Sequence, residues 1–312
     1  MTLDNSLPVV ILAAGDSKRF GGLKHLEVVA GETLVGRQAR LWHEKGAGVT
    51  VIVPPESVEL YRGSGLTRAT VVPRSAPAET NGVKYREALN VADDGPVVIT
   101  FGDVFYTSRA IEAIHAGCEG EAIRLFCRFG PSAYTGKPYG EPFALFLPGA
   151  QRSRFTDALE WVVVEYAEGR IWRDGLWEVA KRLEGVPPER FGEHLPLSMF
   201  VEIDDLTDDI DFPEDLDRLR AVVPSTMDEA IDELSSVMGL ARRMMMSPMG
   251  AVPEPDLHAA FASAVTAGAP SIPPLQVGQS AKLWARWIVA KAGRGVRRVP
   301  SALERRLRVG ST

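Results

Sequence analysis

Short runs of β-branched and other apolar residues alternate with helix-like segments up to about residue 203, and this alternation restricts the fold more than any other feature. Seven runs have the composition and length of buried strands: Val9–Ala13, Val49–Val53, Val71–Pro73, Val97–Phe101, Ile123–Cys127, Phe143–Leu147 and Phe200–Ile203. Three segments between them are typical of helices: Leu34–Lys45, Val83–Ala92 and Ser108–Ala116. Because strands that alternate with helices form a mostly parallel sheet covered by helices, the sequence predicts an α/β fold.

The character of the sequence changes at about Pro224. Beyond it, Met227–Met246 and Ser280–Ala292 are helix-like, and prolines interrupt the chain between them. Acidic residues outnumber basic ones by 34 to 24 in residues 1–224, whereas basic residues outnumber acidic ones by 11 to 7 in residues 225–312. We therefore expect a main domain over residues 1–224 and a helical extension with a basic tail over residues 225–312. Three roles stay open for this extension: contact between copies of the chain (a homo-oligomer), contact with an anionic surface, or a disordered end.

The composition excludes several classes of protein. The chain has 312 residues, 45% hydrophobic and 24% charged, which is enough to bury a sizeable core. A formal net charge of −6 is not that of a protein whose main task is to bind nucleic acid. The apolar runs are too short for a transmembrane segment and no secretory leader precedes them, so we expect a cytoplasmic protein. Cys118 and Cys127 lack the spacing of a metal or redox site, and we expect both to be reduced.

The segment after the first predicted strand has the composition of a loop that binds phosphate. It reads Leu12, Ala13, Ala14, Gly15, Asp16, Ser17, Lys18, Arg19, Phe20, Gly21, Gly22, Leu23 and Lys24. Small residues at a strand end let the backbone approach a ligand closely, and successive N–H groups in such a turn can point at phosphate oxygens. Arg19 supplies a bidentate guanidinium and Lys24 a movable point charge. A glycine-rich turn with solvated basic side chains is the alternative explanation.

This loop resembles the signature Leu-Ala-Ala-Gly-x-Gly-x-Arg-x-Gly, followed by Pro-Lys, of nucleotidyltransferases with the glycosyltransferase-A-like fold. The chain departs from the signature at Ser17, where the second glycine is usual, and at Leu23, where the proline is usual. Related molybdenum-cofactor guanylyltransferases also carry serine at the first of these positions. The resemblance implies a Rossmann-like sheet of the nucleotide-diphospho-sugar transferase type. It also implies that residues 12–17 bind the nucleotide and that Arg19 and Lys24 are catalytic.

Asp103 is a candidate ligand of a magnesium ion. It follows the predicted strand Val97–Phe101, at the carboxyl end where ligands of α/β sheets bind. A turn explains a Gly-Asp pair at a strand end about as well. However, the pair lies about 80 residues after the phosphate loop, where it resembles the metal-binding Gly-Asp of the family. Magnesium prefers oxygen ligands and is usually held by one or two carboxylates together with substrate phosphates.

A second carboxylate candidate lies in residues 202–215, where six aspartates and two glutamates crowd one segment. Like charges at this density need solvent or a cation between them. The segment resembles the Asp-Ile-Asp-Thr-Pro-Glu-Asp-Leu ending of the family, and by this match Asp209 is the first choice for the second metal ligand and Asp211 the next. Asp211 also suits a helix start, as the cap of a helix whose first turn carries Glu214 and Asp215.

Two further segments are candidates for substrate contacts. Asn81 and Gly82 open a predicted helix, whose start offers an amide side chain and free N–H groups to a base or a phosphate. They resemble the base-contacting segment of sugar-phosphate and phosphocholine nucleotidyltransferases, and they equally suit an ordinary helix start. The loop from Tyr134 to Glu141 suits an acceptor site, in which Lys137 would meet a phosphate and Glu141 a hydroxyl or a cationic group. A solvated loop has the same composition.

Together these features predict a magnesium-dependent nucleotidyltransferase that joins a nucleoside triphosphate to a phosphorylated sugar or alcohol and releases pyrophosphate. Two alternatives remain. A glycosyltransferase of the same fold would use Asp209-Ile210-Asp211 as its metal site on a nucleotide-sugar donor, but it would leave Arg19 and Lys24 without a task. A non-catalytic member of the fold would bind the triphosphate without turnover. The sequence names neither the base nor the acceptor.

Overall fold

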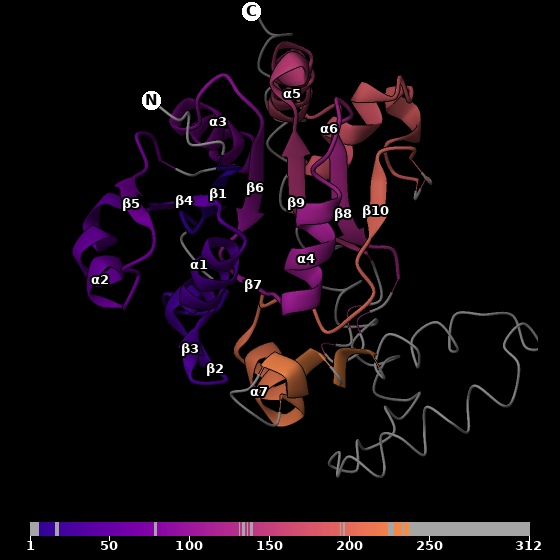
Figure 1. Ribbon diagram of the computed structural model, residues 1–312. Coiled ribbons are helices and arrows are strands. Elements are labelled where there is room, and N and C mark those ends of the chain that lie inside the picture. Colours follow the sequence, from indigo (N-terminus) through magenta and orange to yellow (C-terminus); the bar gives the residue numbers. More distant parts are fainter. Residues whose placement is uncertain are drawn as a thin grey trace, which may run out of the picture.

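The computed structural model describes residues 6–15, 19–77, 80–130, 132, 135, 137, 140–193, 195, 197–223, 228–232 and 234–236. The main sheet consists of β1 (Pro8–Leu12), β4 (Gly48–Val53), β5 (Thr70–Pro73), β6 (Val97–Phe101), β8 (Arg124–Arg128), β9 (Glu141–Leu147) and β10 (Phe200–Glu202). The strands lie in the order β10-β8-β9-β6-β1-β4-β5, with helices on both faces (Figure 1). Among these seven strands, β9 alone runs against its neighbours. The predicted α/β fold with a mostly parallel sheet is confirmed.

The described helices are α1 (Leu34–Glu44), α2 (Val58–Gly63), α3 (Asn81–Val91), α4 (Ser108–Ala116), α5 (Arg152–Ala167), α6 (Leu176–Leu183) and α7 (Pro213–Val222). Single 3-10 turns are η1 (Lys24–Leu26), η2 (Pro55–Ser57), η3 (Gly149–Gln151) and η4 (Pro188–Arg190). Two short antiparallel ladders lie outside the main sheet: β2 (Val28–Val29) with β3 (Glu32–Thr33), and β7 (Val104–Phe105) with β11 (Asp208–Asp209). The sequence did not predict these ladders.

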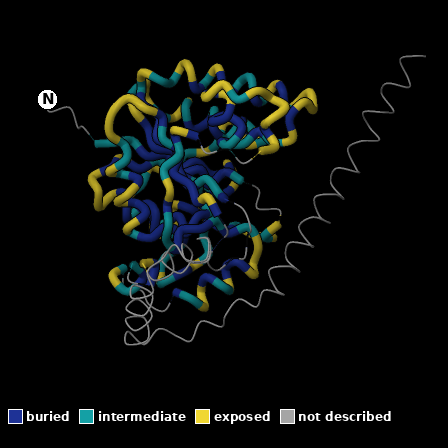
Figure 2. Tube along the Cα trace, turned by 90° about the vertical axis from the view of Figure 1, so that its right-hand side faces the viewer, coloured by how far each residue is buried: buried dark blue, intermediate teal, exposed yellow. Residues whose placement is uncertain are grey.

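Neighbouring residues of the central strands face opposite layers of the molecule. Val9 and Ile11 of β1 belong to a core cluster that includes residues of α1 and α4. Val10 and Leu12 belong to a second cluster with residues of α3, α5 and α6. The sheet is therefore buried on both faces, as the dark centre of Figure 2 shows, and this explains why β1 is an uninterrupted apolar run rather than an alternating one.

Local capping explains where α1 and α4 begin. The Thr33 hydroxyl accepts a hydrogen bond of 3.0 Å from the Gly36 N–H at the start of α1. In the same way, the Thr107 hydroxyl accepts one of 2.9 Å from the Ala110 N–H at the start of α4. Such caps satisfy N–H groups that have no partner within the helix. Two predicted segments, β6 and α4, have the bounds that the sequence indicated.

The described start of the predicted extension packs against the main domain. Residues 228–232 and 234–236 are helical, and Ile231 and Leu234 are buried in a third core cluster with Phe105 of β7. Asp228 forms ion pairs with Arg37 at 2.6 Å and Arg40 at 3.0 Å, both on α1. This stretch therefore shares a core with β7 and α7. The boundary at residue 224 stays a prediction.

The remainder of the extension lies outside the described residues. This applies to the expected helix Ser280–Ala292, to the basic tail, to the helix Met227–Met246 beyond residue 236, and to any contact between copies through them. Within the part of the chain that the structure describes, no helix is long and apolar enough to cross a membrane.

Candidate active site

The site begins where β1 and β6 end beside each other. The Gly102 N–H donates a hydrogen bond of 2.9 Å to the carbonyl of Leu12, which continues the ladder between the two strands. A Cβ atom on Gly102 would lie 2.9 Å from the Ala13 Cβ and 3.1 Å from the His25 ring, so the close approach requires glycine here. This contact sets Asp103 against the start of the predicted phosphate loop.

The β7–β11 ladder brings the two predicted groups of metal carboxylates together. Asp209 of β11 is the register partner of Val104, the residue after Asp103. The Ile210 N–H donates to the Asp103 carbonyl at 2.9 Å. Because side chains alternate along a strand, Asp209 and Asp211 project in similar directions from this segment. Carboxylates about a hundred residues apart in the sequence thus share one site.

Lys24 lies between these carboxylates. Its Nζ is 2.7 Å from Asp103 Oδ2 and 3.7 Å from Asp211 Oδ1, and it donates to the Ile210 carbonyl at 2.7 Å. Burial disfavours the charged ammonium, but the charges of Asp103 and Asp211 outweigh burial and raise the pKa of Lys24. Burial likewise opposes ionisation of Asp103, yet Lys24 holds the pKa of that carboxyl well below its usual range. Both groups are therefore charged at neutral pH.

The other predicted residues of the phosphate loop are placed unevenly. The Arg19 guanidinium is 3.5 Å from Asp211 Oδ2, and its side chain is 55% exposed. Leu12, Ala13 and Ala14 are buried where β1 ends, and Gly15 follows them. Asp16 and Ser17 lie outside the described residues, so their predicted nucleotide contacts stay predictions.

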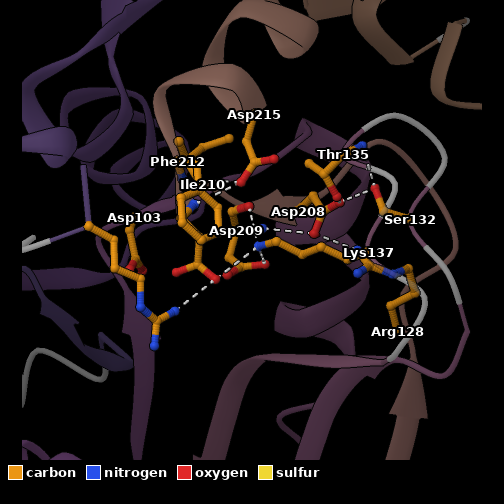
Figure 3. A network of polar contacts seen from close by, with 12 residues as sticks. Asp103, Arg128, Ser132, Thr135, Lys137, Asp208, Asp209, Ile210, Phe212 and Asp215 are labelled. Carbon is orange, nitrogen blue, oxygen red and sulfur yellow. Dashed lines mark hydrogen bonds and ion pairs between the residues drawn. The ribbon is translucent and has the colours of Figure 1, made fainter. Parts of the chain in front are cut away.

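Lys137 faces the carboxylates in this structure, and its predicted contact with an acceptor phosphate stays a prediction. Its Nζ is 2.5 Å from Asp209 Oδ1, 3.0 Å from the Asp209 carbonyl and 3.4 Å from Asp211 Oδ2, and the residue is 7% exposed. Figure 3 shows it reaching from the side of Arg128 toward Asp209, with Asp103 at the opposite side of the network. Asp209 is therefore engaged by Lys137, whereas Asp211 is approached by cations from both sides.

Glu141, the second predicted acceptor residue, begins β9 opposite Arg128. Burial raises its pKa to about 7, although the nearby cations Lys137 and Arg128 lower it. The predicted contact of Glu141 with an acceptor hydroxyl or cation stays a prediction.

A buried ion pair supports the acidic strand. Asp208 Oδ1 is 2.6 Å from the Arg128 guanidinium, and both side chains are almost fully buried. The hydroxyls of Ser132 and Thr135 also donate to Asp208 Oδ2, the second at 3.0 Å. These bonds tie the predicted acceptor loop to β11 (Figure 3).

The predicted cap of the following helix is wrong in its residue. The first helical residue of α7 is Pro213, and its N-cap is Phe212 rather than Asp211. Asp215 does the capping, since its Oδ2 accepts from the N–H groups of Asp211 at 3.2 Å and Phe212 at 3.1 Å. The carboxylate of Asp211 is thus left to face the cations of the site.

The start of α3 corrects a second expectation. Gly82 does not offer a free N–H group, because it donates to Asp174 Oδ2 at 2.8 Å. A Cβ atom on Gly82 would lie 2.3 Å from Val163 Cγ2 of α5, which gives this glycine a packing role. Asn81 Oδ1 accepts from Lys84 Nζ at 3.4 Å. The base contacts predicted for Asn81 and Gly82 stay predictions.

Three polar residues near the loop were not assigned from the sequence. The Arg74 guanidinium donates to the Ala14 carbonyl at 2.8 Å, and Lys84 Nζ would be 3.6 Å from a Cβ atom on Gly15. In the sequence, the signals that could have identified them were the position of Arg74 directly after β5 and that of Lys84 in the first turn of α3. His25 is buried and bonded to the Tyr61 hydroxyl at 2.8 Å, and burial lowers its pKa to about 4, so it is neutral at pH 7.

The donor set suits a magnesium ion that shares its coordination with a substrate. Among the described residues, no group of three or more His, Cys, Asp or Glu side chains is arranged to hold a metal by itself. Asp103 and Asp211 offer carboxylate oxygens around one cation, the Lys24 ammonium. Two carboxylates completed by phosphate oxygens and water are the usual surroundings of magnesium.

Solved structures that match this chain have low sequence identity to it. The inositol-1-phosphate CTP transferase from T. maritima has a TM-score of 0.48 and 13% identity, over 73% of this chain and 96% of that chain. A homologue of Rv0371c of Mycobacterium tuberculosis, from Mycobacterium sp. strain JC1, has a TM-score of 0.48 and 21% identity, over 70% and 96%. A putative glucose-1-phosphate thymidylyltransferase from Bacillus anthracis has a TM-score of 0.49 and 13% identity, over 70% and 95%.

The sequence itself places the chain in a family. No curated protein matches it significantly. The profile of the MobA-like NTP transferase domain matches residues 9–174, from β1 to the segment between α5 and α6. This stretch contains the predicted phosphate loop, Asp103 and Lys137. The chain belongs to the family of MobA-like NTP transferase domains.

Proposed function

We propose that this protein is a magnesium-dependent nucleotidyltransferase that transfers the nucleotide of a nucleoside triphosphate to a phosphorylated sugar or alcohol and releases pyrophosphate. One observation carries the proposal: Lys24 of the phosphate loop lies against Asp103 and Asp211 at the carboxyl ends of β1 and β6. Ligands of open α/β sheets bind at this edge. Membership of the NTP transferase family supports the same activity.

Asp103 and Asp211 are the residues that would hold magnesium. Both face the same ammonium, whereas Asp209 Oδ1 is 2.5 Å from Lys137 Nζ. We therefore prefer Asp211 to Asp209, the first choice from the sequence, as the second ligand. When bound, magnesium neutralises charge on the phosphate oxygens and orients them for in-line displacement.

The chain's cations act on the triphosphate. Arg19 and Lys24 would contact phosphate oxygens and stabilise the negative charge that develops on the leaving pyrophosphate. Lys84, beside Gly15, adds positive charge where the loop begins. In the proposed reaction a bond forms between an acceptor phosphate oxygen and the α-phosphorus, and the bond from the α-phosphorus to the bridging oxygen of pyrophosphate breaks. No protein nucleophile takes part.

The test is an activity panel. The protein is incubated with Mg²⁺, each of the four nucleoside triphosphates and a series of phosphorylated sugars and alcohols, and pyrophosphate is measured. We expect release that requires one base and one class of acceptor. Transfer from nucleotide sugars without pyrophosphate would favour a glycosyltransferase instead. Triphosphate binding with no turnover against any acceptor would favour a non-catalytic member of the fold.

A further inference from the structure

We propose that Lys24 is the resident cation of the Asp103–Asp211 pair in the nucleotide-free protein, and that a triphosphate draws its ammonium away before a divalent cation binds there. The inference rests on the proposed function and adds an order of binding to it. Lys24 then has two successive partners, the carboxylates first and the triphosphate second.

The ammonium is surrounded by oxygens of the kinds that also bind a divalent cation. Three oxygens face Lys24 Nζ: Asp103 Oδ2 at 2.7 Å, the Ile210 carbonyl at 2.7 Å and Asp211 Oδ1 at 3.7 Å. The first two oxygens lie at hydrogen-bond distance from the ammonium, and the third lies within ion-pair distance of it. Carboxylate and carbonyl oxygens are also the ligands of hard divalent cations. We call these three oxygens the oxygen cage.

The backbone of Lys24 is fixed while its side chain can move. The η1 turn is closed by the Leu26 N–H donating to the Leu23 carbonyl at 2.9 Å. The next residue, His25, is anchored through its ring to the Tyr61 hydroxyl at 2.8 Å. A lysine ammonium sits on a flexible four-carbon stem, so it can leave the oxygen cage without a change in the turn. The movement that the proposal requires is thus confined to the lysine side chain.

A triphosphate offers the partner that makes this exchange favourable. An ammonium taken out of a buried ion pair leaves two uncompensated carboxylates, which is costly. Replacement by a divalent cation compensates them, provided that the ammonium finds another anion. A triphosphate bound at the phosphate loop would be that anion, since Gly15 lies beside Lys84 and the charge of Lys84 also acts on Asp103. Nucleotide binding and metal binding are therefore coupled through one side chain.

Lys137 differs from Lys24 in this respect. It contacts Asp209 through both a carboxylate and a carbonyl oxygen and reaches Asp211 at 3.4 Å. Asp103, by contrast, pairs with Lys24. Lys137 therefore compensates the acidic strand from the other side of the oxygen cage. Lys24 is therefore the residue that would compete with a divalent cation for Asp103.

The sign of one measurement separates this proposal from a purely structural role. If Lys24 competes for the oxygen cage, then Lys24→Met should bind a divalent cation more tightly than the natural protein. If Lys24 only holds the two carboxylates in place, its loss lets them move apart and weakens binding. A contact to a charged group changes a binding constant by roughly tenfold to a hundredfold, so the two outcomes are well separated.

The experiment is a titration of the full chain with Mn²⁺ alone, followed by electron paramagnetic resonance, without nucleotide or acceptor. We expect Lys24→Met to bind Mn²⁺ about tenfold or more tightly than the natural protein. Lys84→Met is the matched control, because the charge of Lys84 also acts on Asp103 while its Nζ bonds Asn81. Its affinity should rise by less than about fivefold. With divalent cations removed by excess chelator, Lys24→Met should bind the triphosphate more weakly than the natural protein does.

Thermal unfolding checks that each variant is folded, and Lys24→Gln repeats the titration if Lys24→Met does not fold. Unchanged or weaker Mn²⁺ binding by the folded variant overturns the proposal. So does an equal gain in Lys84→Met, since that result would come from net charge alone. Pyrophosphate release together with a failed titration overturns this inference but not the proposed function. If Lys24→Met binds Mn²⁺ more tightly but the natural protein releases no pyrophosphate with any substrate, the proposed function is overturned and this inference is not.

Discussion

The backbone N–H of Ile210 donates a hydrogen bond of 2.9 Å to the carbonyl oxygen of Asp103. This bond continues the two-residue ladder between β7 and β11. It joins the segment of Asp103 to the segment that carries Asp209 and Asp211. Its consequence is that the carboxylates of Asp103 and Asp211 face one cation. The site is built on backbone pairing rather than on a flexible loop, which holds its geometry before substrate arrives.

Replacement of the two acidic candidates should separate their roles. Asp211→Asn is expected to lower the rate of pyrophosphate release by about a hundredfold, because it removes the negative charge of a carboxylate that we propose as a magnesium ligand. Asp209→Asn should cost clearly less, since Asp209 is already paired with Lys137. Steady-state rates of both variants measure this. A larger loss in Asp209→Asn would restore Asp209 as the ligand.

Lys137→Met should change turnover rather than acceptor binding. Its ammonium contacts Asp209 and Asp211, so its loss leaves buried carboxylates without their cation. We expect kcat to fall and the KM for the acceptor to stay close to that of the natural protein. A raised acceptor KM with an unchanged kcat would show that Lys137 binds the acceptor phosphate.

A matched control for Lys137→Met is Lys181→Met on α6. Lys181 is also buried, and its ammonium bonds the carbonyl of Phe191. Both variants should lower the unfolding temperature, whereas the fall in kcat should be confined to Lys137→Met. An equal loss of kcat in both variants would mean that lost stability, rather than a role of Lys137 in the site, causes the fall.

Gly82→Ala should destabilise the fold by about 1–3 kcal/mol, as expected for overpacking. The new Cβ atom would lie 2.3 Å from Val163 Cγ2, and this clash outweighs the helix propensity that alanine gains. Urea unfolding measures the change. Gly63→Ala at the end of α2 is the control, since nothing lies within 4 Å of its Cβ position, and it should be neutral or slightly stabilising.

The same clash can be relieved from the other side. Adding Val163→Ala to Gly82→Ala should recover part of the lost stability, because the two substitutions share one contact. Additive losses in the double variant would place the cause elsewhere.

The stability of the protein should depend on pH through Glu141. Burial raises the pKa of Glu141 to about 7, from an ordinary value of about 4.3. The folded protein therefore keeps a proton that the unfolded chain has already released, so this group's contribution to stability falls as the pH rises through that window. Glu141→Gln removes this contribution. The unfolding temperature of the variant minus that of the natural protein should increase from about pH 5 to pH 8.

The control for this titration is Glu112→Gln, an exposed glutamate of α4. Its difference from the natural protein should stay flat over the same range. A flat difference for Glu141→Gln as well would mean that Glu141 has an ordinary pKa in the folded protein.

The sheet and its first helices could be predicted because their signals are local. Val97–Phe101 is an apolar run that ends at a glycine, and Ser108–Ala116 follows the capping residue Thr107, so the sequence marks their bounds. The β7–β11 ladder carries no such signal. Each of its strands has two residues, and its register depends on a partner about a hundred residues away. That Asp103 and Asp211 meet was therefore implied by resemblance alone.

The directions in which charged side chains point could not be predicted from the sequence either. Lys137 stands in a segment with the composition of a solvated loop, yet its ammonium is buried against Asp209 because the loop is tied to β11 through Asp208. Arg74 and Lys84 gave little local signal, since a single cation near a strand end or a helix start is common. The amide of Gly82 is taken by Asp174, whose position depends on the packing around α3.

Pyrophosphate release by Asp103→Asn is the decisive measurement of whether Asp103 serves nucleotidyl transfer. The assay uses Mg²⁺, the triphosphate and the acceptor that give the highest rate with the natural protein. We predict a rate lower by about a hundredfold or more, with unfolding behaviour close to that of the natural protein. A folded Asp103→Asn protein that releases pyrophosphate at a near-normal rate would show that Asp103 has no part in the transfer.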